Sequence, residues 1–173
     1  MAEQPAEQTR AFIHQESILN AISVGTVFIL LGVVYVFALP TSLWDRVVGF
    51  FGSFTTRQFA GTGISLPVPI NPGGHMVFYN ALFQFCLGIG LLQILVLALR
   101  LMWHSPVSRL GETTGNLVFW LGASAMIATL LMAITPAMSI ATATSMWFAF
   151  WGALLLILGF SLIARAAVIL LKR

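Results

Sequence analysis

Six polar residues lie near the ends of the long hydrophobic segments of this chain, and four of them are ionisable. If helices bring them together, two acids and two bases would neutralise one another. Ionisable side chains are energetically costly within a membrane, so their presence suggests a function. The chemistry would be structural ion pairing or a path for an ion or polar substrate. We favour ion pairing, because all four charges lie where long side chains reach headgroup water. The residues of this inner polar cluster are Glu16, Asn20, Arg100, Glu112, Asn116 and Arg165.

A second group, the outer polar patch, consists of Asn80 and Gln84 in another part of the second hydrophobic segment. Residues four apart share one face of a helix. Amide side chains between transmembrane helices usually form interhelical hydrogen bonds, which is the favoured interpretation here. The alternative is a substrate site.

The histidines and the single cysteine indicate no cofactor. A haem held between helices needs two axial ligands at similar depth. His75 and His104 fall at opposite ends of one hydrophobic segment, and His14 lies before the first segment. Cys86 alone can form neither a disulfide within the chain nor a cysteine-rich metal site. The pattern predicts interfacial or capping histidines, no metal site and no catalytic residues, and it identifies no reaction.

The composition predicts an integral membrane protein. Of 173 residues, 59% are hydrophobic and 8% are charged, and the mean hydropathy is +0.97. An ordinary soluble domain has about 25% charged residues. The net charge of +3 comes from basic residues that lie singly at segment ends, so no nucleic-acid partner is expected.

Four hydrophobic stretches match the roughly 30 Å thickness of a bilayer core. They predict a single all-α domain over residues 1–173, an integral membrane bundle of four transmembrane helices. The polar N-terminus lacks the basic start and short apolar core of a signal peptide, so the first span is expected to remain in the protein. The predicted spans cover about residues 18–39, 76–103, 106–134 and 146–171.

The longest connection, between the first two spans, divides in two. Over residues 42–59 the apolar positions fall at helical spacing, and Ser42 with Asp45 forms a capping-box pattern. This predicts an amphipathic helix lying in the membrane interface. Residues 60–75 are rich in Gly and Pro and are predicted to form a loop.

The distribution of basic residues predicts the orientation. Lys and Arg are retained on the cytoplasmic side of a membrane. One side has six basic residues in the predicted topology and the other has only Arg46 and Arg57, so we expect a cell-membrane protein with both termini cytoplasmic. Tyr35, Trp44, Tyr79 and Trp147 would form an aromatic belt at the outer interface.

Glycine pairs seven residues apart recur in three of the four spans. Two helical turns separate the members of each pair, so both face the same way and allow a neighbouring backbone to approach. We expect helix packing at these positions, either within the chain or between chains. The pairs are Gly25 and Gly32, Gly115 and Gly122, and Gly152 and Gly159.

These patterns favour a non-catalytic subunit or scaffold of a membrane complex or homo-oligomer. Its partners would be the lipid bilayer and other membrane subunits or copies of itself. One alternative is an oligomeric transporter or channel that uses the polar residues as a path. A second is a membrane enzyme acting on lipid or quinone.

Overall fold

Four long helices dominate the computed structural model, which describes residues 4–37, 42–59 and 61–171. Each contains a stretch long and apolar enough to cross a membrane. The predicted spans therefore coincide with helices, although the last helix begins at Ile140 rather than near Met146. The helices are α1 (Gln4–Phe37), α3 (Met76–Met102), α4 (Val107–Met126) and α5 (Ile140–Leu171).

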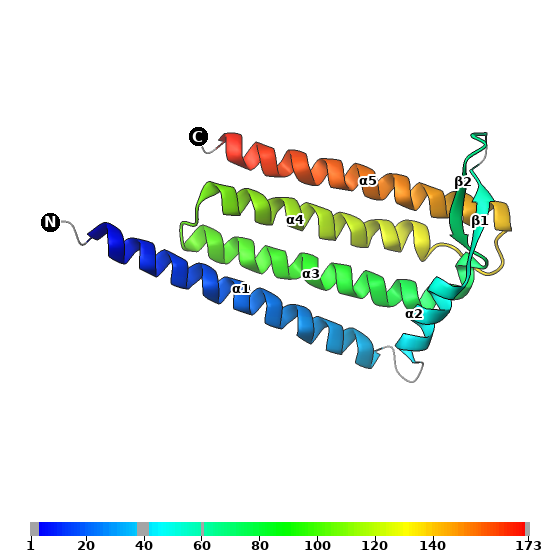
Figure 1. Ribbon diagram of the computed structural model, residues 1–173, viewed down its shortest axis with the longest axis horizontal. Coiled ribbons are helices and arrows are strands. Elements are labelled where there is room, and N and C mark those ends of the chain that lie inside the picture. The colour runs from blue at the N-terminus through cyan, green and yellow to red at the C-terminus, as the bar shows by residue number, and fades with distance from the viewer. Residues whose placement is uncertain (1–3, 38–41, 60, 172–173) are drawn as a thin grey trace.

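The sequence predicted a bundle of four helices, and the four helices lie side by side in an open row (Figure 1). Helix α1 packs on α3, α3 packs on α4, and α4 packs on α5. The start of α1 and the end of α5 lie at the same end of the row, which we call the inner end (Figure 1). Helices α1 and α5 are consequently edge helices, each with one broad face free of the other long helices.

Helix α2 (Leu43–Gly52) occupies the connection between α1 and α3 at the opposite, outer end. The Ser42 hydroxyl accepts a hydrogen bond from the Asp45 backbone N–H at 3.3 Å, as expected of a capping residue. The prediction of a helix as far as residue 59 is wrong, because the helix ends at Gly52 and the backbone is extended from Phe54 onward. Residues 54–58 include two adjacent β-branched threonines, which favour a strand.

A two-stranded hairpin follows α2 and was not predicted. Strand β1 (Phe54–Gln58) pairs antiparallel with β2 (Ser65–Pro69), so that Phe54 lies opposite Pro69. The prolines are tolerated in β2 because each strand of a two-stranded sheet is an edge strand. Residues 60–75 thus contain a strand and the short 3-10 helix η1 (Pro72–His75), where the sequence predicted a loop.

Aromatic side chains fasten α2 and the hairpin to the outer end of the row. The rings of Phe50 in α2 and Phe78 in α3 stack with their centres 4.4 Å apart. The indole N–H of Trp147 in α5 donates to the Pro67 carbonyl of β2 at 3.1 Å. Trp147 is buried against the hairpin, and Tyr79 is buried beside Phe50 and His75, so neither side chain is free to join the predicted aromatic belt at the outer interface.

Helices α4 and α5 approach closely along glycine and serine. A Cβ atom on Gly115 would lie 3.1 Å from the Ser161 carbonyl oxygen, and the Ser161 hydroxyl donates to the Gly115 carbonyl at 2.8 Å.

The last turns of α4 continue as the π-helical segment η2 (Ile127–Leu131), in which the Met132 N–H donates to the Ile127 carbonyl at 2.9 Å.

Candidate functional site

A buried ion pair joins α1 to α3 at the inner end. Arg100 Nη2 lies 3.0 Å from Glu16 Oε2, and both side chains are about nine-tenths buried. Arg100 Nη1 also donates to the Arg109 carbonyl at 3.0 Å and to the Thr113 hydroxyl. The Ser105 hydroxyl donates to Glu16 Oε1 at 3.4 Å. One guanidinium thus connects α1, α3 and α4, and its charge is balanced by one carboxylate.

The structure separates the rest of the inner polar cluster from this pair. Glu112 lies 3.1 Å from Arg109 in a solvent-exposed pair along α4. Asn20, Asn116 and Arg165 are exposed on three different helices. The predicted grouping of six residues is therefore reduced to Glu16 and Arg100, with Ser105 and Thr113 as partners that the sequence did not indicate.

The outer polar patch lies along the α3 face that turns toward α1. Asn80 is exposed and Gln84 is half-buried. Gly88, one turn further on the same face, meets Leu30 of α1, whose Cδ2 would lie 2.6 Å from an added Cβ. The patch thus adjoins the seam between α1 and α3, where amide groups are suited to interhelical hydrogen bonding.

The predicted glycine pairs divide into two kinds. Gly115 and Gly122 lie in the α4–α5 contact, where the nearest atoms belong to Ser161 and Ile157. The four glycines on the edge helices are different: among the described residues, no atom other than those of the local helix lies within 4 Å of a Cβ placed on them. These are Gly25, Gly32, Gly152 and Gly159.

The histidines have separate environments. His75 Nε2 lies 3.1 Å from the Ser53 hydroxyl, which ties the end of α2 to the start of α3. His14 and His104 are exposed at the other end of the row. Within the part of the chain that the structure describes, no three His, Cys, Asp or Glu side chains gather as metal ligands would.

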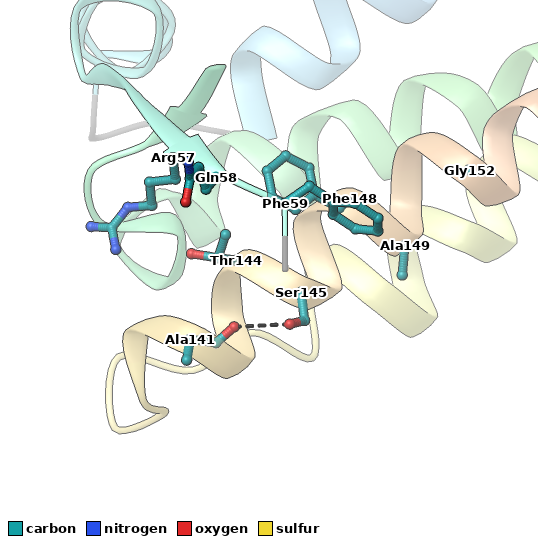
Figure 2. Close-up of a pocket in the computed structure, with 9 residues that line it drawn as sticks. All are labelled: Arg57, Gln58, Phe59, Ala141, Thr144, Ser145, Phe148, Ala149 and Gly152. Carbon is teal, nitrogen blue, oxygen red and sulfur yellow. Dashed lines mark hydrogen bonds between the residues drawn. The ribbon is translucent and has the colours of Figure 1, made fainter. Parts of the chain in front are cut away.

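A hollow of about 740 Å³, which was not predicted, lies between β1 and the first turns of α5 (Figure 2). Its polar wall comes from Arg57, Gln58, Thr144 and Ser145. Arg57 Nε and Thr144 Oγ1 are both buried and lack a hydrogen-bond partner among the described residues. The remaining wall is apolar. We call this space the hairpin hollow.

A second, entirely apolar space lies deeper between α2, α3, α4 and α5. Its volume is about 410 Å³, within the range of small-molecule pockets, and aromatic rings supply much of its wall. Tyr79 and Cys86 contribute to its wall, but the surface facing the space is apolar. The arrangement at this position is suited to packing or to an alkyl chain.

No protein-family model, curated protein or solved structure matches the chain.

Proposed function

We propose that the protein is a non-catalytic subunit of a membrane assembly, inserted as four spans and joined through its edge helices to copies of itself or to other membrane proteins. The observation that carries this proposal is the exposed pair Gly25 and Gly32 on α1. Glycine within a helix is less stable than alanine by roughly 0.5–1 kcal/mol, and no described neighbour in this chain requires its small size. A helix of another subunit would pack against these glycines, because small residues let transmembrane backbones approach closely.

The unequal burial of the helices supports the same proposal. In the most apolar stretches of α3 and α4, 28% of the residues are buried within the chain, against 11% in α1 and 6% in α5. The edge helices therefore present most of their side chains outward, to lipid or to another protein. The open row also favours a subunit over a transporter or channel, because a conducting path would have to form between several copies.

The proposed orientation has both termini in the cytoplasm. Arg100, Arg109 and Arg165 lie toward the inner end of the row, together with the start of α1 and the connection from α3 to α4 (Figure 1). Arg46 and Arg57 belong to α2 and the hairpin at the outer end. Since basic residues are retained on the cytoplasmic side, the inner end is the proposed cytoplasmic end. In this orientation α2 would lie in the outer interface, with Trp44 exposed.

Purification in a mild detergent followed by native mass spectrometry tests the assembly. We expect a mass larger than one chain, and we expect Gly25→Leu with Gly32→Leu to shift the population to single chains. Val24→Phe with Leu31→Phe is the matched control, because these exposed residues lie at the same depth on an adjacent flank of α1. A wild-type protein that is monomeric and free of other proteins would contradict the proposal, as would a glycine variant that assembles like the wild type.

A further inference from the structure

The hairpin hollow contains two buried polar groups that have no hydrogen-bond partner in the part of the chain that the structure describes. Thr144 is only 8% exposed, and its hydroxyl has no hydrogen-bond partner among the described residues. Helical Ser and Thr hydroxyls commonly donate to the carbonyl four residues earlier. Thr113, Thr114 and Ser145 do so here, at 2.9, 2.9 and 3.0 Å. The Thr144 hydroxyl makes no such bond, although a buried hydroxyl without a partner is destabilising.

Arg57 is the second group. Among residues 4–37, 42–59 and 61–171, its buried Nε has no hydrogen-bond partner, and Arg57 takes part in neither of the two ion pairs. In Figure 2 the Arg57 side chain extends along one side of the hollow, and the Thr144 hydroxyl points toward that side. A guanidinium and a hydroxyl that both retain a free donor are suited to the oxygens of an anion, and Arg suits phosphate in particular.

The opposite part of the hollow is apolar. Phe59 and Phe148 meet edge to face with ring centres 5.1 Å apart, and Gly152 contributes no side chain. The same three residues line a neighbouring space of about 380 Å³ that continues along α5 to Leu155. From Ala141 to Leu155 the helix rises roughly 20 Å, at about 1.5 Å per residue. The two spaces therefore form a groove that is polar at one end and apolar along the rest.

The direction of this groove matches that of a lipid. Its polar end is lined by β1 and the first turns of α5, which lie at the outer end of the row (Figure 1). Its apolar part follows α5 as far as Leu155, within the stretch that is apolar enough to cross a membrane. We propose that the groove binds an anionic phospholipid, with the phosphate at Arg57 and Thr144 and an acyl chain along Phe148 and Gly152. This site requires membrane insertion but not the assembly proposed above.

Lipid titration of the full-length protein, followed by native mass spectrometry, tests the site. The probes are phosphatidylglycerol and phosphatidylcholine with the same acyl chains. We expect phosphatidylglycerol to bind at least about tenfold more tightly, because both lipids carry an ionised phosphate but the choline cation of phosphatidylcholine offsets its attraction to the Arg57 guanidinium. Arg57→Gln should abolish this preference, and Thr144→Val should weaken the binding of both lipids. Arg46→Gln is the matched control, because Arg46 is an exposed arginine of α2 outside the groove.

A second arm separates a lipid from a free anion. Gly152→Leu places a side chain in the apolar part of the groove, where no described atom beyond the local helix lies within 4 Å of the added Cβ. This variant should lose phosphatidylglycerol, and sodium phosphate should not displace the lipid from the wild type. Displacement by sodium phosphate, together with a Gly152→Leu variant that binds like the wild type, would identify a free-anion site and overturn the proposal.

Folding is monitored by thermal unfolding of each variant. If Arg57→Gln fails to fold, Thr144→Val still tests the site, because valine keeps the shape of the threonine side chain. Equal binding of the two lipids by the wild type would overturn the proposal. So would an equal loss of preference in Arg46→Gln and Arg57→Gln, because the preference would then reflect overall charge rather than this groove.

Discussion

The Arg100 guanidinium lies 3.0 Å from the Glu16 carboxylate, across 84 positions of the sequence, and this ion pair joins edge helix α1 to the rest of the row. Both side chains are buried, so neither charge has ready access to water if its partner is removed. The pair therefore stabilises the protein only when both side chains are present.

Removing one member of this pair should destabilise the protein. Loss of one partner from a buried ion pair typically costs about 3–5 kcal/mol, because the other charge is left uncompensated. We expect Glu16→Leu or Arg100→Met to lower the free energy of unfolding in mixed detergent micelles by about 3 kcal/mol. The double variant should lose less than the sum of the two single losses.

The exposed pair of Arg109 and Glu112 supplies the control for this experiment. Exposed ion pairs usually contribute no more than about 1 kcal/mol. Arg109→Met should therefore change the free energy of unfolding much less than Arg100→Met. Equal effects of the two substitutions would show that burial of the Glu16–Arg100 pair does not determine its contribution.

The hydrogen bond from Trp147 to Pro67 should hold the hairpin against α5. Trp147→Phe removes the indole donor and retains an aromatic ring, at an expected cost of about 1 kcal/mol. Backbone amides of β1 and β2 should then exchange with deuterium roughly fivefold faster. The control is Trp151→Phe, because Trp151 is half exposed and lies one turn further along the same helix. Unchanged exchange in Trp147→Phe would show that other contacts hold the hairpin.

The four long apolar helices could be predicted from the sequence because length and hydropathy are local properties of a segment. Their arrangement in a row could not, because it depends on which faces meet. The chemical types of Glu16 and Arg100 predicted an ion pair, whereas Glu112 was expected to join them and instead pairs with Arg109 on its own helix.

The outer end was less predictable for a related reason. The helical spacing of apolar residues continued as far as Phe54, while the strand over residues 54–58 depends on pairing with residues 65–69. The hairpin lies against the start of α5, where it covers Trp147 and lines one hollow with Thr144, whose hydroxyl has no partner among the described residues. Arg57 is the only Asp, Glu, Lys or Arg between Arg46 and Arg100, and this isolated charge was the signal that could have directed attention to this surface.

Two glycine substitutions should have opposite effects on stability. An alanine at Gly115 would place its Cβ 3.1 Å from the Ser161 carbonyl oxygen, so helices α4 and α5 must separate slightly. Overpacking of this kind costs roughly 1–3 kcal/mol. Gly159→Ala meets no such contact within the chain and should stabilise α5 by up to about 1 kcal/mol. Unfolding in a dissociating detergent measures both, and the same sign for both would contradict the observed α4–α5 contact.

Single cysteines can test the proposed orientation, because the only native cysteine, Cys86, is buried and can be replaced by alanine. Ser65→Cys in the hairpin and Ser108→Cys at the start of α4 are matched positions, since both serines are exposed and only α3 crosses between them. With the termini in the cytoplasm, a membrane-impermeant maleimide should label Ser65→Cys on intact cells and should label Ser108→Cys only after permeabilisation. The reverse pattern would place the termini outside. Labelling of both positions from one side would show that α3 does not cross the membrane, which would contradict the four-span insertion itself.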